Sequence, residues 1–398
     1  MVTTIESCEL LLLSARYRPE EVWGWPGGVY RGWTSAFVRL TGADGTIGHG
    51  EIGDGLNTPD LVPPLLHRAA QMVVGLPAEP RAVLQALTRG APGWGHGGLF
   101  SSVVAGIEMA TFDLLGRSLG TPASVLLGGP VRTELPVYAS GGLDPCPDAV
   151  RAEVRRHVSD GFRAVKIRIG YGTQTDVRRV AAAREELGPD ADLMLDLGAS
   201  YLPEPPDLRT VVTLARALEP YSPYWLEDPL PRTDVTGHAR LRGDIDMRVA
   251  TGENERTPDH VQRLLDAEAV DVIQTDAVYV GGILRQMELA ALVESAGARL
   301  APHTWCSGPG VMANATVVAC APAGLYVELP RVPNALRERT LAQALRLTDG
   351  RMQLPDLPGL GIQLDDELAT WAFDPDAGPR LHNARDASSA SLGPEAAR

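Results

Sequence analysis

Residues 161–197 read GFRAVKIRIGYGTQTDVRRVAAAREELGPDADLMLDL and contain one strand–helix–strand unit. Two short apolar runs, AVKIRI at 164–169 and DLMLDL at 192–197, flank a stretch whose apolar residues have helical spacing. Two strands joined by a crossover helix run parallel in one sheet. This stretch therefore predicts a parallel β/α unit.

Similar strand candidates recur from about residue 135 onward, at intervals of about 27 residues. They are LPVYAS at 135, AVKIRI at 164, DLMLDL at 192, YWLED at 224, RVATGE at 248, DVIQTD at 271, RLAPHT at 299 and LYVEL at 325. Most intervals contain a helical pattern. Eight near-equal units favour an α/β fold, a closed (β/α) TIM-type barrel, over the alternative of an open doubly wound sheet.

The first third of the chain has an α+β texture. Residues 33–52 predict a hairpin around Asp44-Gly45, and helical patterns follow it. We expect an N-terminal α+β capping domain over residues 1–130 and the barrel over 131–355. A C-terminal segment, 356–377, is expected to return to the capping domain, and the small polar residues 378–398 to form a flexible tail.

Bulk composition limits the classes of partner. The net charge of −14 opposes binding to nucleic acid or anionic membranes, and no run of about 18 apolar residues suggests a membrane span. The N-terminal MVTTIESCELLLLSARYR predicts a first strand rather than a signal peptide. Four scattered cysteines without a CxxC pair suit a reduced cytoplasm. We therefore expect a cytoplasmic protein that acts on small molecules.

The basic residues are almost all arginine. Lys166 is the single lysine among 36 basic residues. Arginine stays protonated in proteins, whereas lysine can lose its proton when its pKa is lowered. The exception suggests a side chain that must release a proton, although chance retention is an equal alternative.

Chemically useful side chains stand at the ends of most of the expected strands, where barrel active sites lie. They are Lys166 and Arg168 on the second strand, Asp196 on the third, Glu227 on the fourth, Glu253 on the fifth, Asp276 on the sixth, His303 on the seventh and Glu328 on the eighth. Alternation along a strand puts Lys166 and Arg168 on one face.

Three neighbouring units contribute carboxylates that would converge, namely Asp196, Glu227 and Glu253. A single carboxylate at a strand end is more often a helix cap or a surface residue. Three together would repel one another unless a cation compensates their charge, and Mg²⁺ prefers such oxygen ligands. The pattern favours a metal site.

His303 and Asp276 lie at the ends of neighbouring expected strands. A carboxylate next to a histidine can orient and charge-stabilise the ring, which makes it a competent acid or base. Lys166 and His303 lie on opposite sides of the carboxylates around the expected barrel. Each could therefore serve one face of a bound substrate.

In their order and spacing these motifs resemble the enolase superfamily and, within it, the mandelate racemase subgroup. The matching motifs are GIEMATFDLLGRSLGTPASVLLGG at 106–129, AVKIRIG at 164–170, LMLDLGASY at 193–201, WLEDPL at 225–230, ATGENERTP at 250–258, QTDAVYVGG at 274–282, PHTW at 302–305, YVELP at 326–330 and LPDLPGLGI at 354–362. They span nearly the whole chain.

The resemblance implies that Asp196, Glu227 and Glu253 hold Mg²⁺, which binds the carboxylate of the substrate. A base then removes the α-proton, and preorganised positive charge stabilises the enediolate. Glu328, if protonated, would donate a hydrogen bond to a carboxylate oxygen. Asp276 takes the place of a lysine of the muconate-cycloisomerase subgroup, so the pair with His303 indicates the mandelate racemase subgroup.

One position departs from the family pattern. The usual second-strand motif resembles Lys-x-Lys, with the second lysine as base, and here that position is Arg168. Arg168 is then either a fixed cation that binds substrate or lowers the pKa of Lys166, or a sign of one-base chemistry. In the second case His303 is active and Lys166 serves the carboxylate.

The leading functional hypothesis is a lyase that dehydrates a sugar acid. A cycloisomerase or a racemase/epimerase acting on related acids or lactones is the runner-up, and a non-catalytic metal-binding protein is the alternative of another class. A zinc hydrolase would need more histidines at strand ends. Trp25, Tyr30 and Trp305 are candidate substrate contacts, with loops 17–31 and 91–100 expected to cap the site. The resemblance also implies a homo-oligomer.

Overall fold

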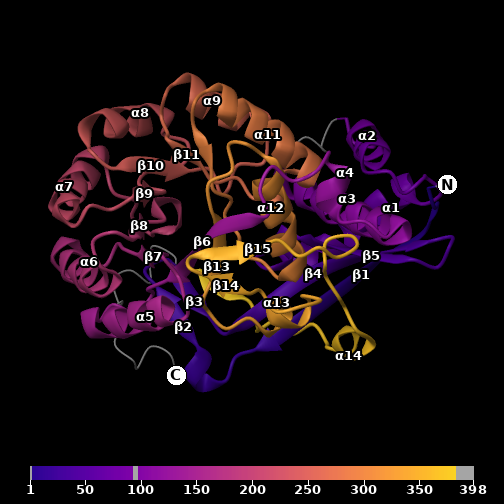
Figure 1. Ribbon diagram of the computed structural model, residues 1–398, viewed down its shortest axis with the longest axis horizontal. Helices are drawn as coiled ribbons and strands as arrows, with labels where there is room; N and C mark the ends of the chain where they lie inside the picture. Colours follow the sequence, from indigo (N-terminus) through magenta and orange to yellow (C-terminus); the bar gives the residue numbers. More distant parts are fainter. Residues whose placement is uncertain (1, 93–96, 382–398) are drawn as a thin grey trace.

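The structure is a computed structural model that describes residues 2–92 and 97–381. Figure 1 shows two parts: a ring of strands surrounded by helices, and a smaller α+β part beside it. This arrangement confirms the expected barrel with a capping domain.

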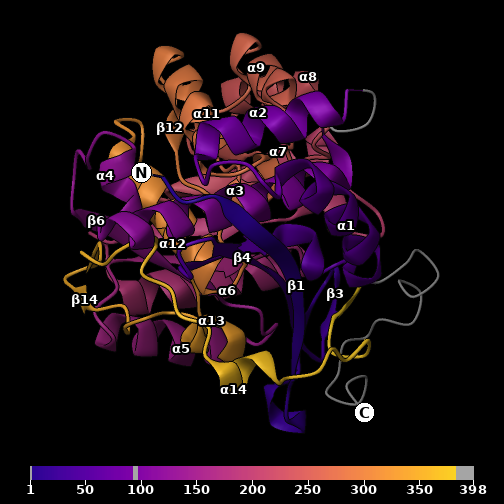
Figure 2. The same ribbon diagram turned by 90° about the vertical axis from the view of Figure 1, so that its right-hand side faces the viewer.

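The capping domain is built on a three-stranded antiparallel sheet in the order β1-β4-β5. Its strands are β1 (Ile5–Arg16), β4 (Gly32–Gly42) and β5 (Ile47–Ile52), and its helices are α1 (Val62–Val73), α2 (Pro80–Gly90) and α3 (Gly98–Leu119). The β4–β5 hairpin turns at Asp44-Gly45 as expected, with Gly45 at φ +79°, a conformation that glycine adopts without strain. Figure 2 shows β1 crossing the side of this domain that faces away from the barrel.

Helix α3 is the centre of the capping domain. Its length and apolar composition would let it cross a membrane, but 89% of its most apolar window is buried inside the protein. It ends at Gly120, whose left-handed backbone (φ +64°) closes the last turn. Helix α3 therefore serves as a core helix against β5 and α2.

The barrel contains eight parallel strands that coincide with the eight strand candidates of the sequence. They are β6 (Glu134–Gly141), β7 (Ala164–Arg168), β8 (Asp192–Asp196), β9 (Trp225–Glu227), β10 (Arg248–Thr251), β11 (Val272–Ile273), β12 (Arg299–Leu300) and β13 (Val327–Pro330). Each pairs with the next from β6 to β12, and β13 pairs with β6. The bridge from Leu300 to Gly324, just before β13, closes the ring.

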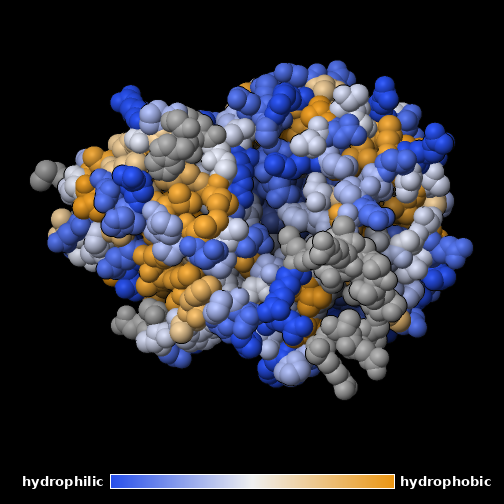
Figure 3. All heavy atoms as spheres, turned by 180° about the vertical axis from the view of Figure 1, so that it is seen from behind, coloured by the Kyte–Doolittle hydropathy of each residue, from blue (hydrophilic) through white to orange (hydrophobic). Residues whose placement is uncertain are grey.

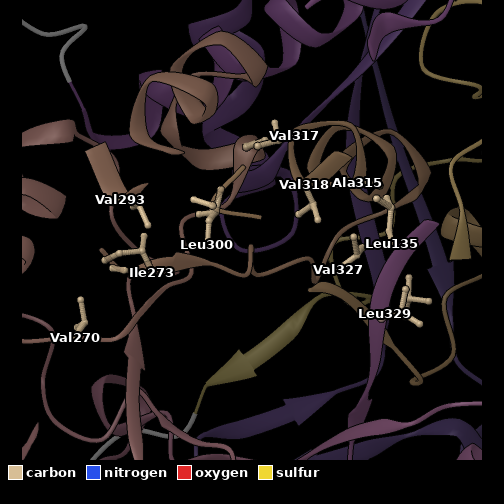
Figure 4. Close-up of a cluster of buried hydrophobic side chains, with 14 of the residues drawn as sticks. Leu135, Val270, Ile273, Val293, Leu300, Ala315, Val317, Val318, Val327 and Leu329 are labelled. Carbon is tan, nitrogen blue, oxygen red and sulfur yellow. The ribbon is translucent and has the colours of Figure 1, made fainter. Parts of the chain in front are cut away.

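Helices cover the outside of the ring, as Figure 1 shows. They are α5 (Pro147–Ser159), α6 (Thr173–Leu187), α7 (Leu208–Leu218), α8 (Val235–Asp244), α9 (Pro258–Asp266), α11 (Ile283–Ser295) and α12 (Gly308–Cys320). The short helices α4 (Ala123–Leu126), α10 (Ala277–Val280) and α13 (Ala335–Arg339) contact elements of the capping domain. Branched aliphatic residues fill the layer between strands and helices, and Figure 4 shows those around β11, β12, β13 and α12.

The chain after the barrel contributes small elements: β14 (Leu347–Thr348), β15 (Arg351–Gln353), α14 (Asp366–Ala369) and β16 (Pro379–Leu381). Leu364 and Leu368 pack in a cluster with Trp33 and Phe37 of the capping domain. Strand β16 pairs with β3 (Gly28–Tyr30), which pairs with β2 (Trp23–Trp25). Residues 379–381, expected in the flexible tail, are thus part of a sheet. The rest of that expected tail, 382–398, lies outside the described residues.

Candidate active site

The site lies where the barrel strands end, and the sequence candidates are gathered there. Lys166 and Arg168 come from β7, Asp196 and Glu227 are the last residues of β8 and β9, Glu253 follows β10, Asp276 precedes α10, His303 follows β12 and Glu328 lies in β13. Six of these eight side chains are buried or nearly so, with exposures of 10% or less, and that of His303 is 14% exposed. Only Arg168, at 13%, is comparably open.

Lys166 lies among three carboxylates. Its Nζ is 2.5 Å from Glu227 Oε1, 2.8 Å from Glu328 Oε1 and 3.7 Å from Asp196 Oδ2. Burial favours the neutral amine, but Glu227 and Glu328 outweigh it and hold the pKa of Lys166 well above its usual value. In this arrangement the surrounding carboxylates stabilise the ammonium, which does not support the releasable proton that the single lysine suggested.

Arg168 is fixed on two sides. Its Nη1 donates to Asp196 Oδ1 at 2.8 Å, and its guanidinium carbon lies 4.3 Å from the ring centre of Trp25. The pKa of Arg168 is raised further, since Asp196 and Glu253 outweigh the effect of burial. The arginine is thus a positioned cation that cannot accept a proton.

His303 and Asp276 form the expected pair. His303 Nδ1 lies 3.0 Å from Asp276 Oδ2, and Nε2 lies 3.7 Å from Glu253 Oε2. Burial lowers the pKa of His303, but the Glu253 charge and the Asp276 hydrogen bond raise it to about 10. With Nδ1 held by Asp276, Nε2 is the ring atom left for proton transfer.

Glu328 is an acceptor rather than the protonated donor that the sequence suggested. It accepts hydrogen bonds from the backbone N–H of Thr304 at 2.8 Å and from Trp305 Nε1 at 3.0 Å. Burial raises its pKa, but Lys166 and His303 lower it to about 2. Its lone pairs are therefore already engaged within the protein, and the carboxylate is ionised.

The three candidate metal ligands lie at the ends of consecutive strands, but their carboxylates are not grouped closely enough to hold a metal ion. Glu227 accepts hydrogen bonds from Lys166, from Trp225 Nε1 at 3.0 Å and from Gln274 Nε2 at 2.7 Å. Within residues 2–92 and 97–381, no three His, Cys, Asp or Glu side chains stand close enough to hold a metal as they are placed.

The charge and chemistry of the ion-paired cluster nevertheless suit a divalent cation. Five carboxylates (Asp196, Glu227, Glu253, Asp276 and Glu328) share three cationic side chains (Lys166, Arg168 and His303), which leaves two negative charges uncompensated. Burial and the neighbouring carboxylates raise the pKa of Glu227 to about 7, despite Lys166. Hard carboxylate oxygens with excess negative charge are the donor set that Mg²⁺ prefers.

A cavity adjoins these residues and encloses about 660 Å³ of empty space, part of it open to solvent. Arg168, Asp196, Glu253 and His303 supply its charged lining, whereas Lys166 is not among its lining residues. The rest of the lining is mostly aromatic or apolar: Trp23, Trp25, Tyr30, Leu56, Asn57, Leu143, Tyr201, Asn254, Tyr279 and Trp305.

The expected substrate contacts are in this lining, and their ring positions are fixed by packing. Tyr30 stacks on Trp23 with ring centres 4.1 Å apart, and Trp23 meets Trp305 edge-on at 5.6 Å. Loop 17–31 thus lines the cavity as expected. The described part of loop 91–100 does not line it, and residues 93–96 lie outside the described residues.

Several lining residues were not singled out from the sequence. Tyr201 and Asn254 lie within quoted motifs, directly after the third and fifth strands, so their position was the available signal. Tyr201 donates a hydrogen bond to Asn254 Oδ1 at 2.8 Å. Leu56 and Asn57 come from the capping domain, and no sequence pattern marks them as neighbours of barrel residues.

The chain matches two family models. Residues 31–128 match the mandelate racemase/muconate lactonizing enzyme N-terminal domain, and residues 149–368 match the enolase C-terminal domain-like model. D-galactarolactone cycloisomerase of Agrobacterium fabrum is 29% identical over 85% of this chain and 91% of the relative.

Two further relatives bear on chemistry. L-talarate/galactarate dehydratase of Salmonella typhimurium is 30% identical over 70% of this chain and 67% of its own. The structure of an enolase from Bradyrhizobium, complexed with magnesium and mandelic acid, has a TM-score of 0.80 and 27% identity, covering 92% of this chain and 98% of that one.

Proposed function

Because the chain belongs to the mandelate racemase/muconate lactonizing enzyme family of the enolase superfamily, we propose that it is a Mg²⁺-dependent enzyme that removes the proton α to a substrate carboxylate. Dehydration of a sugar acid is the reaction we favour, and cycloisomerisation of a related acid or lactone is the second candidate. Dehydratases and a cycloisomerase among the relatives support both.

The observation that carries the proposal is the His303–Asp276 pair at a cavity that also holds Asp196, Glu253 and Arg168. The cavity lining offers both an imidazole that can transfer a proton and carboxylates that can bind a cation. A non-catalytic metal-binding protein would not need an oriented histidine facing an enclosed cavity. The arrangement therefore favours catalysis.

Asp196, Glu227 and Glu253 are the residues that would hold Mg²⁺. When bound, the ion would compensate their charge, including the Glu253 charge that raises the pKa of His303, and would polarise the substrate carboxylate. A neutral imidazole is the form that can accept a proton. The charge excess of the site and the magnesium in the Bradyrhizobium enolase structure support this proposal.

The cavity favours one-base chemistry over racemisation. A two-base racemase needs an acid/base group on each face of the substrate. Arg168 cannot accept a proton, and Lys166 is ion-paired and outside the lining residues. His303 Nε2 would take the α-proton and return a proton to the hydroxyl that leaves the β-carbon as water. The product is then the enol of a 2-keto acid.

The remaining roles complete the proposal. Trp25, Tyr30 and Trp305 would pack on the substrate, since rigid aromatic walls surround the charged end of the cavity. Glu328 would hold Lys166 in place. The described cysteines are all free, which supports a reducing, cytoplasmic setting. We further propose a homo-oligomer.

The test is α-proton exchange in D₂O with mandelate, D-galactarolactone, L-talarate and galactarate, followed by NMR. We expect exchange of at least one acid with Mg²⁺, none after EDTA treatment, and recovery when Mg²⁺ is returned. Glu227→Gln should lose most of the Mg²⁺ affinity measured by calorimetry. Full exchange in metal-free buffer would refute the metal requirement.

A further inference from the structure

Helix α12 lies behind the His303–Asp276 pair and carries one buried amide. Asn314 is fully buried in an otherwise largely apolar helix. Its Nδ2 donates to Asp276 Oδ1 at 2.7 Å and to the His303 carbonyl oxygen at 3.3 Å. Its Oδ1 accepts from the Ala277 backbone N–H at 3.0 Å. One side chain thus contacts both members of the pair and the residue that follows Asp276.

These contacts define how the Asp276 carboxylate is turned. Oδ1 receives Asn314 Nδ2 and the Val278 backbone N–H at 3.1 Å, so Oδ2 remains for His303 Nδ1. The amide of Asn314 is itself oriented, because its oxygen faces an N–H donor and its nitrogen faces a carboxylate. In a flipped amide, the Asn314 oxygen would face the Asp276 carboxylate oxygen, and the two would repel each other. The asparagine therefore selects one orientation of the carboxylate.

The helix that carries Asn314 is anchored from the capping domain. Glu51 of β5 accepts the backbone N–H groups of Ser307 at 2.9 Å and Gly310 at 3.1 Å. Ser35 of β4 donates to Glu51 at 3.2 Å and shares a 2.7 Å hydrogen bond with Ser307. A carboxylate at the first turn satisfies the free N–H groups of a helix start. The position of α12, and with it Asn314, depends on the docked capping domain.

We infer that Asn314 is a positioning residue for the His303–Asp276 pair, a role that rests on the proposed function of His303. Asn314 is not among the cavity-lining residues and so has no expected contact with substrate. It acts through Asp276 by keeping Oδ2 directed at His303 Nδ1. That hydrogen bond fixes the ring tautomer and leaves Nε2 toward the cavity.

Removing the amide should affect turnover rather than substrate binding. Without Asn314, Asp276 Oδ1 keeps only the Val278 N–H in a dry interior, so the carboxylate would rotate or shift. Misplacement of a catalytic group by about 1 Å costs on the order of 10²-fold in rate. For Asn314→Leu, which keeps the number and branching of side-chain heavy atoms, we expect kcat to fall about 10- to 100-fold with KM within about 2-fold.

The decisive measurement needs no substrate. In the full-length protein, the His303 Nδ1 proton bonded to Asp276 should give a downfield proton NMR signal, identified by its loss in His303→Asn. Asn314→Leu should weaken or shift this signal. The matched control is Thr316→Val, a similar change of a buried polar residue on the same helix. It should leave the signal and kcat at wild-type values.

The outcomes separate this inference from the proposed function. A wild-type signal and wild-type kcat in Asn314→Leu would overturn the role of Asn314, as would an equal loss in Thr316→Val. If His303→Asn still exchanges the α-proton of the acid that wild type exchanges fastest, the proposed role of His303 as the base fails instead. If Asn314→Leu does not fold, Asn314→Ser gives the same readouts with a smaller side chain.

Discussion

Lys166 and His303 divide two tasks that the sequence left open between them. Lys166 is the single lysine of the chain and is bonded to Glu227 and Glu328, whereas His303 borders the cavity. These positions suit Lys166 to the fixed charge, and His303 to the proton transfer, that we propose for them. The alternative assignment is that Lys166 itself loses and accepts a proton. Exchange experiments can distinguish the two assignments.

We expect His303→Asn to slow α-proton exchange in D₂O by about 10²- to 10⁴-fold, the usual contribution of a positioned base. Lys166→Arg keeps the charge but cannot accept a proton near neutral pH. It should retain exchange well above that of His303→Asn, and Lys166→Ala should retain less than Lys166→Arg. Exchange that stops in Lys166→Arg and persists in His303→Asn would reverse the assignment.

The arginine at position 168 bears on whether the enzyme could protonate both faces of an enediolate. Held between Asp196 and Trp25, its guanidinium occupies the position of the second lysine in the family motif. A lysine there could protonate the second face of an enediolate, and an arginine cannot. The single difference from the family motif therefore disfavours racemisation and is compatible with the proposed proton removal by His303.

At the scale of elements, buried carboxylates of the capping domain hold the starts of barrel helices. Glu51 accepts backbone N–H groups at the start of α12. Glu108 of α3 accepts those of Ile283 and Leu284 at the start of α11, both at 2.8 Å. Both carboxylates are buried. Each helix start thus finds its acceptors in the other domain, which couples the two parts electrostatically.

Glu108 predicts a pH dependence of stability. Burial raises its pKa from 4.5 to about 8, although the two backbone N–H groups act in the opposite direction. The folded state therefore binds more protons than the unfolded state between these values, and stability falls as pH rises from about 4.5 to 8. Glu108→Gln cannot ionise. The Tm of wild type minus that of Glu108→Gln should decrease across this range in calorimetry.

Thr111→Val provides the matched control, because Thr111 is buried on the same helix and does not titrate. Its Tm difference from wild type should stay constant with pH. A wild-type minus Glu108→Gln difference that is flat or rises with pH would show that Glu108 is ionised in the folded protein throughout, held by the two N–H groups of α11.

The elements also show which features of the fold and the site can be predicted from the sequence. Short apolar runs at a regular interval predict all eight barrel strands, because period and turn signals are local. The side chains at strand ends follow from that assignment alone. Asn314 could not be found in this way: it sits in the small-residue helix GVMANATVVAC, and its partner Asp276 is 38 residues away. Leu56 and Asn57 reach the cavity only through docking of the capping domain.

At the scale of the whole molecule, the two parts are joined by a partly buried ion pair as well as by helix caps. Arg256, after β10, donates to both oxygens of Asp54 at 2.6 and 2.7 Å, and its guanidinium lies 4.7 Å from the Tyr279 ring centre. Asp54 also accepts from Ser102 of α3 at 2.7 Å. Such bidentate contacts fix geometry as well as distance. The capping domain is thereby held over the end of the barrel that carries the site.

Exposed apolar side chains near the junction of the capping domain and the barrel support the proposed homo-oligomer. Leu119, Val125 and Val131 are 53%, 51% and 58% exposed. Figure 3 shows a further group of hydrophobic residues on the opposite, back face, on the side of the capping domain. Contiguous apolar surface on a soluble protein commonly marks an interface, since its burial is favourable.

We expect sedimentation velocity at micromolar concentration to show a species larger than the 42.4 kDa chain. Charged side chains at Val125→Glu and Val131→Glu should shift it toward monomer, because burying an unpaired carboxylate is costly. Arg209→Glu, on exposed α7 of the barrel, introduces the same side chain elsewhere and should leave assembly unchanged. Wild type that sediments only as a monomer would contradict the assembly, and an oligomer insensitive to the double substitution would exclude this surface.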